Sequence, residues 1–389
     1  MDRQVEKASL CALGKIFGFE PKIATALITH AGSASDVFRF EREELEQILG
    51  PYSRYRWQIR PEAVERAHDE LMSLQEKGIR YSGWTEEDGY PSILKECPDP
   101  PVGLYIRSDT EPQELWKPER KIAIIGTRDI SMYGKEWCEK IVQGLEACNE
   151  KPLIISGLAL GTDICAHKAA LEAGLPTIGV MATGPESIYP HRNMQTAMQM
   201  IKTPGCGLVT DYPPGTAPLA IHFLRRNRII AGLAEATILI ESRIKGGGMM
   251  TSRLAFSYDR DVYALPGRAD DICSQGCNDL IRSKIAEPIT SVQHLIESLG
   301  MKGGAKGKKV NEREMLTNLY GQAMPPEKLE TILSLLKEIR KERGITIEEL
   351  SCACGLPFHH TVNICGLLES DGLISIDILQ RCSINAKNF

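Results

Sequence analysis

Short apolar runs alternate with helical segments through the middle of the chain, from residue 121 to residue 299. Each run is four or five residues long and is bounded by Gly or Pro, which is typical of buried strands in a parallel sheet. The repeated order of strand and helix predicts an α/β fold with a doubly wound parallel sheet. The predicted strands are Lys121–Ile125, Leu153–Ser156, Thr177–Met181, Gly207–Asp211, Thr237–Glu241 and Val262–Leu265. The predicted helices are Glu136–Ala147, Ile164–Ala173, Arg228–Ala234, Thr251–Tyr258 and Asp279–Ile285.

The pattern changes on both sides of this region. Residues 1–80 have apolar positions at helical spacing and predict an N-terminal helical module, loosely similar to sterile-alpha-motif or helix-hairpin-helix modules. A plain structural helical bundle fits the same pattern. The central domain then spans residues 81–300 and begins with a Pro-rich connector, in which Leu104–Arg107 alternates like an edge strand.

The end of the chain has its own pattern. Residues 301–312 are mainly small and basic, which is typical of a flexible linker. Residues 313–389 then run helix, helix, helix, strand, the order of a winged-helix-like module. Its predicted recognition helix contains His359, His360 and Asn363 but no Arg or Lys, so we expect this module to bind a protein partner rather than DNA.

Composition and charge narrow the function classes. The chain has 389 residues, of which 42% are hydrophobic and 25% charged, which is ordinary for a globular protein and excludes fibrous classes. Its 46 basic and 51 acidic residues give a net charge of -5, so any nucleic-acid site must be local. No apolar run is long enough to span a membrane, and the first residues do not resemble a signal peptide. We therefore expect a cytoplasmic protein.

The residues give little sign of metal, cofactor or nucleophilic chemistry. Twelve cysteines are scattered without a C-x-x-C pair, so we expect reduced thiols and no metal site. The chain lacks a Walker loop and the dinucleotide fingerprint, so we expect no cofactor. His167 has no nucleophile at motif spacing, and we expect it to be a packed residue rather than a catalytic base.

Glycine, arginine and hydroxyl side chains follow one predicted strand after another. Ligands of parallel sheets bind beyond the carboxyl ends of the strands, where these residues would meet. A glycine turn that opens a helix offers free backbone amides to an anion, and an arginine adds a bidentate donor. The candidate residues at these ends are Gly126, Thr127, Arg128 and Ser131 after the first strand, Ser156, Gly157 and Gly161 after the second, and Gly247 after the fifth.

Three arginines, Arg225, Arg226 and Arg228, stand where we expect a helix to begin. Cations at a helix N-terminus oppose the helix dipole and repel one another. A bound phosphate would remove that conflict by using the same amides and guanidinium groups. This cluster, with Asn227 inside it, is therefore predicted to bind phosphate.

In combination these segments resemble the DNA-processing protein A family, also called Smf. The matching motifs are Gly126–Arg128 with Ser131–Gly134, Ser156–Asp163 with Ala166 and His167, Tyr189–Pro190 with Asn193, Tyr212–Gly215, Arg226–Leu233 and Ala264–Gly267. The resemblance implies an extended Rossmann-like, mostly parallel domain that binds single-stranded DNA, forms a homodimer and helps to load the RecA recombinase onto incoming DNA in natural transformation. It implies no enzymatic activity.

The resemblance also implies roles for single residues. Arg128 would hold a strand phosphate, and Phe223 would stack on a base, a contact that tolerates any sequence. Backbone amides or hydroxyls at Gly126, Ser156, Gly157 and Gly161 would add contacts, and Arg226, Asn227 and Arg228 would line the same groove. The chain departs from the family pattern at Thr210-Asp211, which keeps a carboxylate, and at Lys245–Met249, where the local contacts are therefore open.

One enzymatic alternative shares the predicted sheet. Lysine-decarboxylase-like nucleotide hydrolases cleave nucleoside monophosphates and contain Pro-Gly-Gly-x-Gly-Thr-x-x-Glu. The nearest segments here, Pro214–Ala217 and Gly246–Thr251, lack the glutamate at that offset, so the general acid or base of that reaction is missing. We therefore expect a binding protein, with the hydrolase as the alternative.

Overall fold

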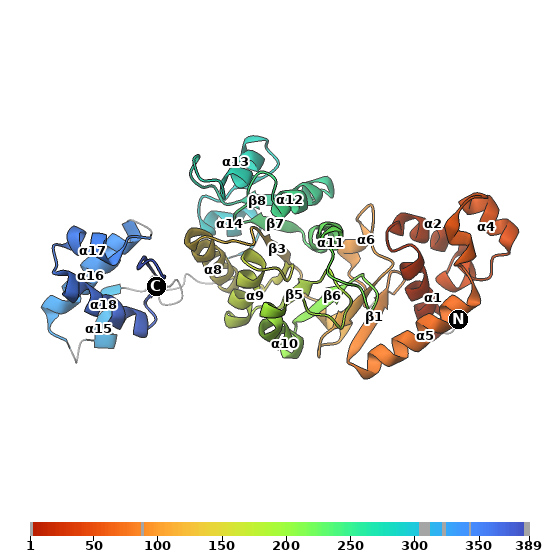
Figure 1. Ribbon diagram of the computed structural model, residues 1–389, viewed down its shortest axis with the longest axis horizontal. Coiled ribbons are helices and arrows are strands. Elements are labelled where there is room, and N and C mark those ends of the chain that lie inside the picture. The colour runs from red at the N-terminus through yellow and green to blue at the C-terminus, as the bar shows by residue number, and fades with distance from the viewer. Residues whose placement is uncertain (1–2, 87–88, 303–311, 321–323, 342–343, 385–389) are drawn as a thin grey trace.

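The computed structural model describes residues 3–86, 89–302, 312–320, 324–341 and 344–384. Within these ranges a nine-stranded sheet forms the centre of the molecule, in the order β1-β2-β6-β5-β4-β3-β7-β8-β9 (Figure 1). The strands from β6 to β9 in this order run parallel, while β1 and β2 add an antiparallel edge. The strands are β1 (Ile79–Gly83), β2 (Gly103–Arg107), β3 (Lys121–Ile125), β4 (Leu153–Ser156), β5 (Thr177–Val180), β6 (Gly207–Thr210), β7 (Ala236–Leu239), β8 (Asp261–Ala264) and β9 (Glu287–Pro288).

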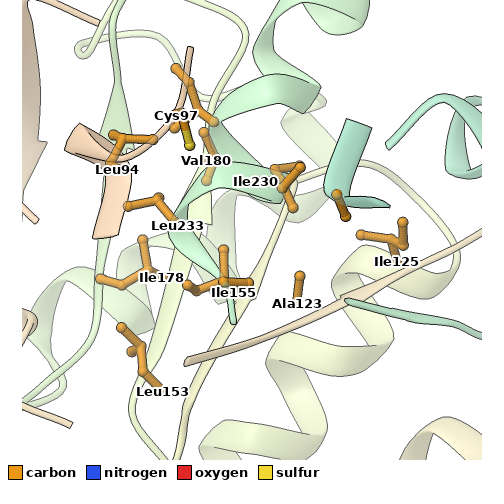
Figure 2. Packing of buried hydrophobic residues seen from close by; sticks show 14 of the residues in the cluster. Leu94, Cys97, Ala123, Ile125, Leu153, Ile155, Ile178, Val180, Ile230 and Leu233 are labelled. Atoms are coloured by element: carbon orange, nitrogen blue, oxygen red, sulfur yellow. The ribbon is translucent and has the colours of Figure 1, made fainter. Parts of the chain in front are cut away.

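Helices cover both faces of the sheet, because successive side chains of each strand point to opposite faces. On one face Ile122, Ile124 and Ile154 pack against the helices that follow β3 and β4. On the other face Ala123, Ile125 and Ile155 form the larger core with Ile230 and neighbouring residues (Figure 2). The first layer contains α8 (Met132–Glu146), α9 (Thr162–Glu172), α10 (Met194–Lys202) and α14 (Val292–Ser298), and the second contains α6 (Ser92–Lys95), α11 (Ala220–Leu233), α12 (Gly247–Ser257) and α13 (Gln275–Arg282). The short helices α7 (Pro112–Leu115) and η2 (His191–Asn193) lie in connections.

The N-terminal helices share a hydrophobic core with the antiparallel edge of the sheet. Phe17 and Leu13 are fully buried, and Tyr81 and Tyr105 from β1 and β2 belong to the same cluster. Pro21 opens its helix at a position where no amide partner is needed, and Gly32 ends that helix with φ 87°, a conformation that glycine adopts without strain. The helices are α1 (Arg3–Ile16), α2 (Pro21–Ala31), α3 (Ala34–Val37), α4 (Arg42–Leu49), the 3-10 helix η1 (Arg54–Trp57) and α5 (Pro61–Glu76).

The C-terminal elements have a core of their own. Leu335, Leu350 and Leu368 are fully buried in it, and every member of this cluster lies between residues 316 and 382. Thr346 and Glu349 form a capping box that fixes the start of one of its helices. The elements are α15 (Glu312–Tyr320), α16 (Pro326–Lys341), α17 (Ile347–Cys354), α18 (Phe358–Ser370) and the antiparallel pair β10 (Ile374–Ile376) and β11 (Cys382–Ile384).

The structure confirms the predicted α/β class and all six predicted strands, with ends that differ by a residue or two. The elements that were not predicted include β1, the two-residue β9, β11, α14 and α10, which follows a proline-containing loop. The strand at 104–107 forms, but it is not at the edge, because β1 pairs on one side of it and β6 on the other. Among the described residues no helix is both long enough and apolar enough to cross a bilayer.

Candidate nucleic-acid interface

A groove of about 620 Å³ opens at the carboxyl ends of the parallel strands. It lies where the chain order reverses, because β3 has β4 on one side and β7 on the other. Ligands of doubly wound sheets bind at this switch point. The described lining residues are Ile125–Arg128, Ala159, Asp163, Tyr189, Pro218, Ala220, Phe223, Leu224, Arg226, Asn227, Ile230, Ser242, Arg243, Lys245–Gly248 and Thr251.

The groove is basic although the chain is acidic. Its described lining contains four cationic side chains, Arg128, Arg226, Arg243 and Lys245, and one carboxylate, Asp163. Arg128, Arg243 and Lys245 are exposed, and none of them forms an ion pair with a described carboxylate. An anionic ligand would therefore meet free positive charge here, as a local site on an acidic molecule requires.

Aromatic rings stand beside this charge. The guanidinium carbon of Arg128 lies 5.3 Å from the ring centroid of Phe223, and the Phe223 ring meets the Tyr189 ring edge to face at 5.8 Å. Tyr189 is 47% exposed. A phosphate-binding cation and exposed ring surface next to each other are the two components from which single-strand sites are built.

Helix N-termini complete the anion-binding character of the groove. Both α11 and α12 begin at its wall, with Ala220 and Gly247 as their first residues. No side chain caps either helix start, so the first amides are available to a ligand. A Cβ on Gly247 would have no atom within 4 Å, which leaves open space for a ligand to approach the backbone.

The structure corrects the predicted start of the arginine-rich helix. Helix α11 begins at Ala220, so Arg225, Arg226 and Arg228 lie in its second and third turns rather than at its N-terminus. The prediction that these arginines oppose the helix dipole was therefore wrong. It failed because the helix already begins at Ala220, two residues after Pro218, and the sequence analysis did not take that proline as the mark of the helix start.

Arg226 and Asp163 form the buried floor of the groove. Arg226 is 4% exposed and donates a hydrogen bond to the carbonyl oxygen of Val180. Asp163 accepts a hydrogen bond of 3.3 Å from the amide of Ala159, and burial raises its pKa although the charge of Arg226 opposes that rise. Burial likewise lowers the pKa of Arg226. These two groups hold the β4–α9 loop against α11 and set the shape of the floor.

Arg228 does not line the groove. Its guanidinium forms an ion pair of 2.5 Å with Asp211 and donates to the carbonyl oxygen of Asp99. Burial raises the pKa of Asp211, against the opposing charge of Arg228. This pair ties α11 to the end of β6 and to the connector before β2, which is a structural role.

Four other predicted residues, Ser131, Ser156, Gly157 and Gly161, do not line the groove but support the loops around it. Ser131 caps α8 and donates to Glu241, and Ser156 donates a 2.6 Å bond to the carbonyl oxygen of Ile124. Gly157 and Gly161 permit close packing, since a Cβ on either would collide with neighbouring groups. Gly126, Thr127, Asn227 and Gly247 do line the groove, together with Arg128, Phe223 and Arg226.

The sequence analysis missed four charged or aromatic lining residues: Asp163, Tyr189, Arg243 and Lys245. Asp163, Tyr189 and Lys245 lay inside segments already noted, but the sequence pattern did not show that their side chains line the groove. His167, in contrast, is buried as expected, with ring nitrogens 2.7 Å from the Thr177 hydroxyl and 2.6 Å from the Gly157 carbonyl oxygen. Burial lowers its pKa to about 4, so it is neutral at physiological pH.

Known proteins are similar to this chain in sequence and in fold. The family model described as DNA recombination-mediator protein A matches residues 83–300. The DNA processing protein DprA of Bacillus subtilis is 37% identical over 229 residues, which cover 59% of this chain and 74% of that protein. The Streptococcus pneumoniae DprA is 39% identical over 210 residues, covering 54% of this chain and 71% of that protein.

Two solved structures are similar. The X-ray structure of DprA from Streptococcus pneumoniae has a TM-score of 0.60 and 29% identity, covering 73% of this chain and 95% of that chain. DNA processing protein A from Helicobacter pylori, whose structure describes its single-stranded DNA binding mode, has a TM-score of 0.50 and 30% identity, covering 56% of this chain and 95% of that chain. The chain therefore belongs to the DNA recombination-mediator protein A family.

Proposed function

We propose that this protein binds single-stranded DNA in the groove between β3, β4 and β7 and acts as a recombination mediator. It would protect incoming strands and help to load the RecA recombinase during natural transformation. The observation that carries the proposal is the exposed Arg128 beside the Phe223 and Tyr189 rings in a basic groove. The DNA-binding mode of the Helicobacter pylori relative supports the choice of ligand.

The arrangement favours a strand over a duplex. Bases of a single strand are free to stack on the exposed Tyr189 ring and the half-buried Phe223 ring while phosphates meet Arg128, Arg243 and Lys245. Duplex DNA hides the faces of its bases and would retain only the phosphate contacts. We also propose that the protein acts as a homodimer in the cytoplasm, with the winged-helix-like C-terminal module binding a protein partner.

We propose a binding role without catalysis. The described groove lining contains one carboxylate, and its surroundings support this proposal. Asp163 is buried beside Arg226 and accepts a backbone hydrogen bond, so it is held as part of the floor. A glycosidic hydrolase would need a carboxyl group free to exchange a proton with substrate. Glu241, which follows β7, is buried and accepts hydrogen bonds from the amide and hydroxyl of Ser131.

The test compares labelled oligo-dT with a matching duplex by fluorescence anisotropy over a salt series. We expect tighter binding to the single strand. Arg128→Gln should weaken it roughly tenfold or more, the value of one charge-assisted hydrogen bond, and should make the salt dependence shallower. Phe223→Ala should weaken binding with an unchanged salt slope. Arg282→Gln is the matched control, because Arg282 is exposed and pairs with Asp279 away from the groove.

Mediator activity is tested with the same variants by following RecA ATP hydrolysis on strands already coated with single-strand-binding protein. The wild type should shorten the lag and Arg128→Gln should not. If the wild type binds no oligonucleotide but cleaves a nucleoside monophosphate, the proposal is wrong and the hydrolase alternative is correct.

A further inference from the structure

Helix α11 carries a second arginine–aromatic pair, and this pair joins it to the N-terminal helices. The guanidinium carbon of Arg225 lies 4.0 Å from the ring centroid of Phe19 and the same side chain donates to the Phe19 carbonyl oxygen. Phe19 stands in the turn between α1 and α2 and is 53% exposed. The helix that forms one wall of the groove is therefore in direct contact with an exposed ring of the N-terminal module.

A basic and aromatic segment lies next to that ring. Residues 50–61 contain Arg54, Arg56 and Arg60 and no acidic residue. The buried Tyr55 ring packs on Phe17 with centroids 4.6 Å apart, two residues before Phe19. Arg54 donates a hydrogen bond of 2.8 Å to the Tyr55 hydroxyl, so its guanidinium lies beside a ring that packs just before the α1–α2 turn.

The outer part of the segment presents two further rings. Trp57 is 46% exposed, with the guanidinium carbons of Arg42 and Arg56 at 4.3 and 5.1 Å from its ring. Tyr52 is 98% exposed. We call Phe19, Arg42, Tyr52, Arg54, Trp57 and Arg225 the N-terminal aromatic surface.

The charges on this surface are available to a ligand. Glu46 neutralises Arg56 in an ion pair of 2.7 Å. Neither Arg42 nor Arg54 forms an ion pair with a described carboxylate, and both are exposed. An exposed ring with a guanidinium beside it can stack on a base while the cation meets the adjacent phosphate. A purely apolar protein segment would have to desolvate these arginines without a counter-charge.

We propose that single-stranded DNA leaving the groove continues onto the N-terminal aromatic surface, so that one strand is held by both parts of the chain. The proposal rests on the proposed function, because it extends the same bound strand. Arg128 with Phe223 would hold one section of the strand, and Arg225 with Phe19, then Arg54 and Trp57, would hold the next.

The test is a length series of labelled oligo-dT, from about 5 to about 30 nucleotides, a range that brackets the site sizes of single-strand-binding domains. Full-length wild type is compared with Tyr52→Ser plus Trp57→Ala and with Arg54→Gln. These side chains lie at the surface and make few contacts, so their loss should lower the free energy of unfolding by about 1 kcal/mol or less, which urea unfolding checks. Short strands should bind the variants and the wild type equally. Long strands should bind the aromatic variant roughly tenfold more weakly, and Arg54→Gln should reduce the salt slope by about 0.7.

Arg39→Gln is the matched control, since Arg39 is an exposed arginine of the same module that pairs with Asp36. A second measurement needs no variant of the surface: photocrosslinking of 5-iodouracil along a long strand should label Tyr52 or Trp57 peptides, and Arg128→Gln should reduce that labelling. If Arg128→Gln weakens strands of every length while the surface variants bind long strands like the wild type, the inference is wrong and the proposed function stands.

Two other outcomes also overturn it. Loss of a protein partner from the surface variants, with long-strand binding intact, would assign the surface to that partner. If the wild type binds no strand of any length, the proposed function and the inference are both wrong. In that case Arg128→Gln has no binding to weaken, which distinguishes this outcome from failure of the inference alone.

Discussion

The arginines that the sequence analysis assigned to one groove differ in how deeply they are buried. Arg128 is exposed at the groove, whereas Arg226 is held by a buried carbonyl and Arg228 by a buried carboxylate. Removing one partner of a buried pair leaves the other charge without compensation and costs about 3–5 kcal/mol. Loss of DNA binding in an Arg228 variant would therefore report unfolding as readily as a lost contact. Arg128 is the arginine whose substitution measures the strand contact itself.

His167 should make stability depend on pH. Its folded pKa is about 4, below the ordinary value of 6.5, so the folded protein binds fewer protons than the unfolded chain between these values. Stability is then fully present above pH 6.5 and is lost as pH falls toward 4. From pH 7 to pH 5 this one group should cost about 2 kcal/mol of unfolding free energy.

The measurement is urea unfolding at pH 7 and pH 5 for the wild type and His167→Gln. The variant should be less stable at pH 7, because the hydrogen bonds to Thr177 and Gly157 are lost or weakened, but it should lose less stability on going to pH 5. The raised pKa values of Asp163, Asp211 and Glu241 act in the opposite direction in both proteins and cancel in the comparison. Equal pH dependence of the two proteins would contradict the assignment.

Sequence reasoning found the residue types of the site better than their exposure. Gly126, Thr127 and Arg128 were found because a glycine turn after a buried strand has one place to go in a parallel sheet. Arg228 was assigned to the groove because it stands in the arginine cluster where a helix was expected to begin, and because the family resemblance includes it. Side chains two residues apart on a helix point in directions about 200° apart. Because α11 begins two turns earlier than expected, the arginines that face outward differ from those predicted.

The loops at the strand ends differ in how much room they leave, and two glycines show the difference. Gly161 has φ 77°, and a Cβ there would collide with the carbonyl oxygen of Thr127 and the backbone of Arg128. Gly247 opens α12 with free space around it. Gly161 is therefore needed by the fold, whereas Gly247 leaves the space at the start of α12 open.

Gly161→Ala should therefore lower the unfolding free energy by about 2 kcal/mol or more and weaken strand binding, because the loop that carries Arg128 is displaced. Gly247→Ala should keep or raise stability, by up to about 1 kcal/mol, and still weaken binding, because its methyl group fills the approach to the α12 amides. Urea unfolding and anisotropy on the same samples check both. Unchanged binding in Gly247→Ala would exclude the α12 N-terminus from the site.

Element prediction succeeded where an element is set by its own sequence. The six parallel strands are short apolar runs with punctuation at both ends, and all of them form. The two-residue β9 was missed because it exists through pairing with Tyr263 and Ala264 rather than through a pattern of its own. Similarly, 104–107 looks like an edge strand until β1, more than twenty residues earlier, pairs with it.

The two ends of the chain relate differently to the sheet. The N-terminal helices share one hydrophobic cluster with Tyr81, Val102 and Tyr105, which crosses the boundary predicted at residue 80. The C-terminal cluster contains only residues from 316 to 382, and the clusters of the sheet contain none of these. The sequence pattern does not reveal a shared core, since sharing depends on which surfaces meet.

Truncation should reveal this difference. A chain ending at residue 302 keeps every hydrophobic cluster of the sheet and of the N-terminal helices. It should therefore unfold at the same urea midpoint as that part of the full chain. It should also bind long oligo-dT within about twofold of the full chain, which corresponds to surface changes of up to about 0.5 kcal/mol. A chain beginning at residue 79 exposes the faces of Tyr81 and Tyr105 that are now buried, and should be expressed poorly or aggregate. Anisotropy, urea unfolding and size-exclusion chromatography measure these outcomes. If instead the chain ending at 302 loses strand affinity as strongly as Arg128→Gln does, the C-terminal unit contacts DNA, and its assignment to a protein partner is wrong.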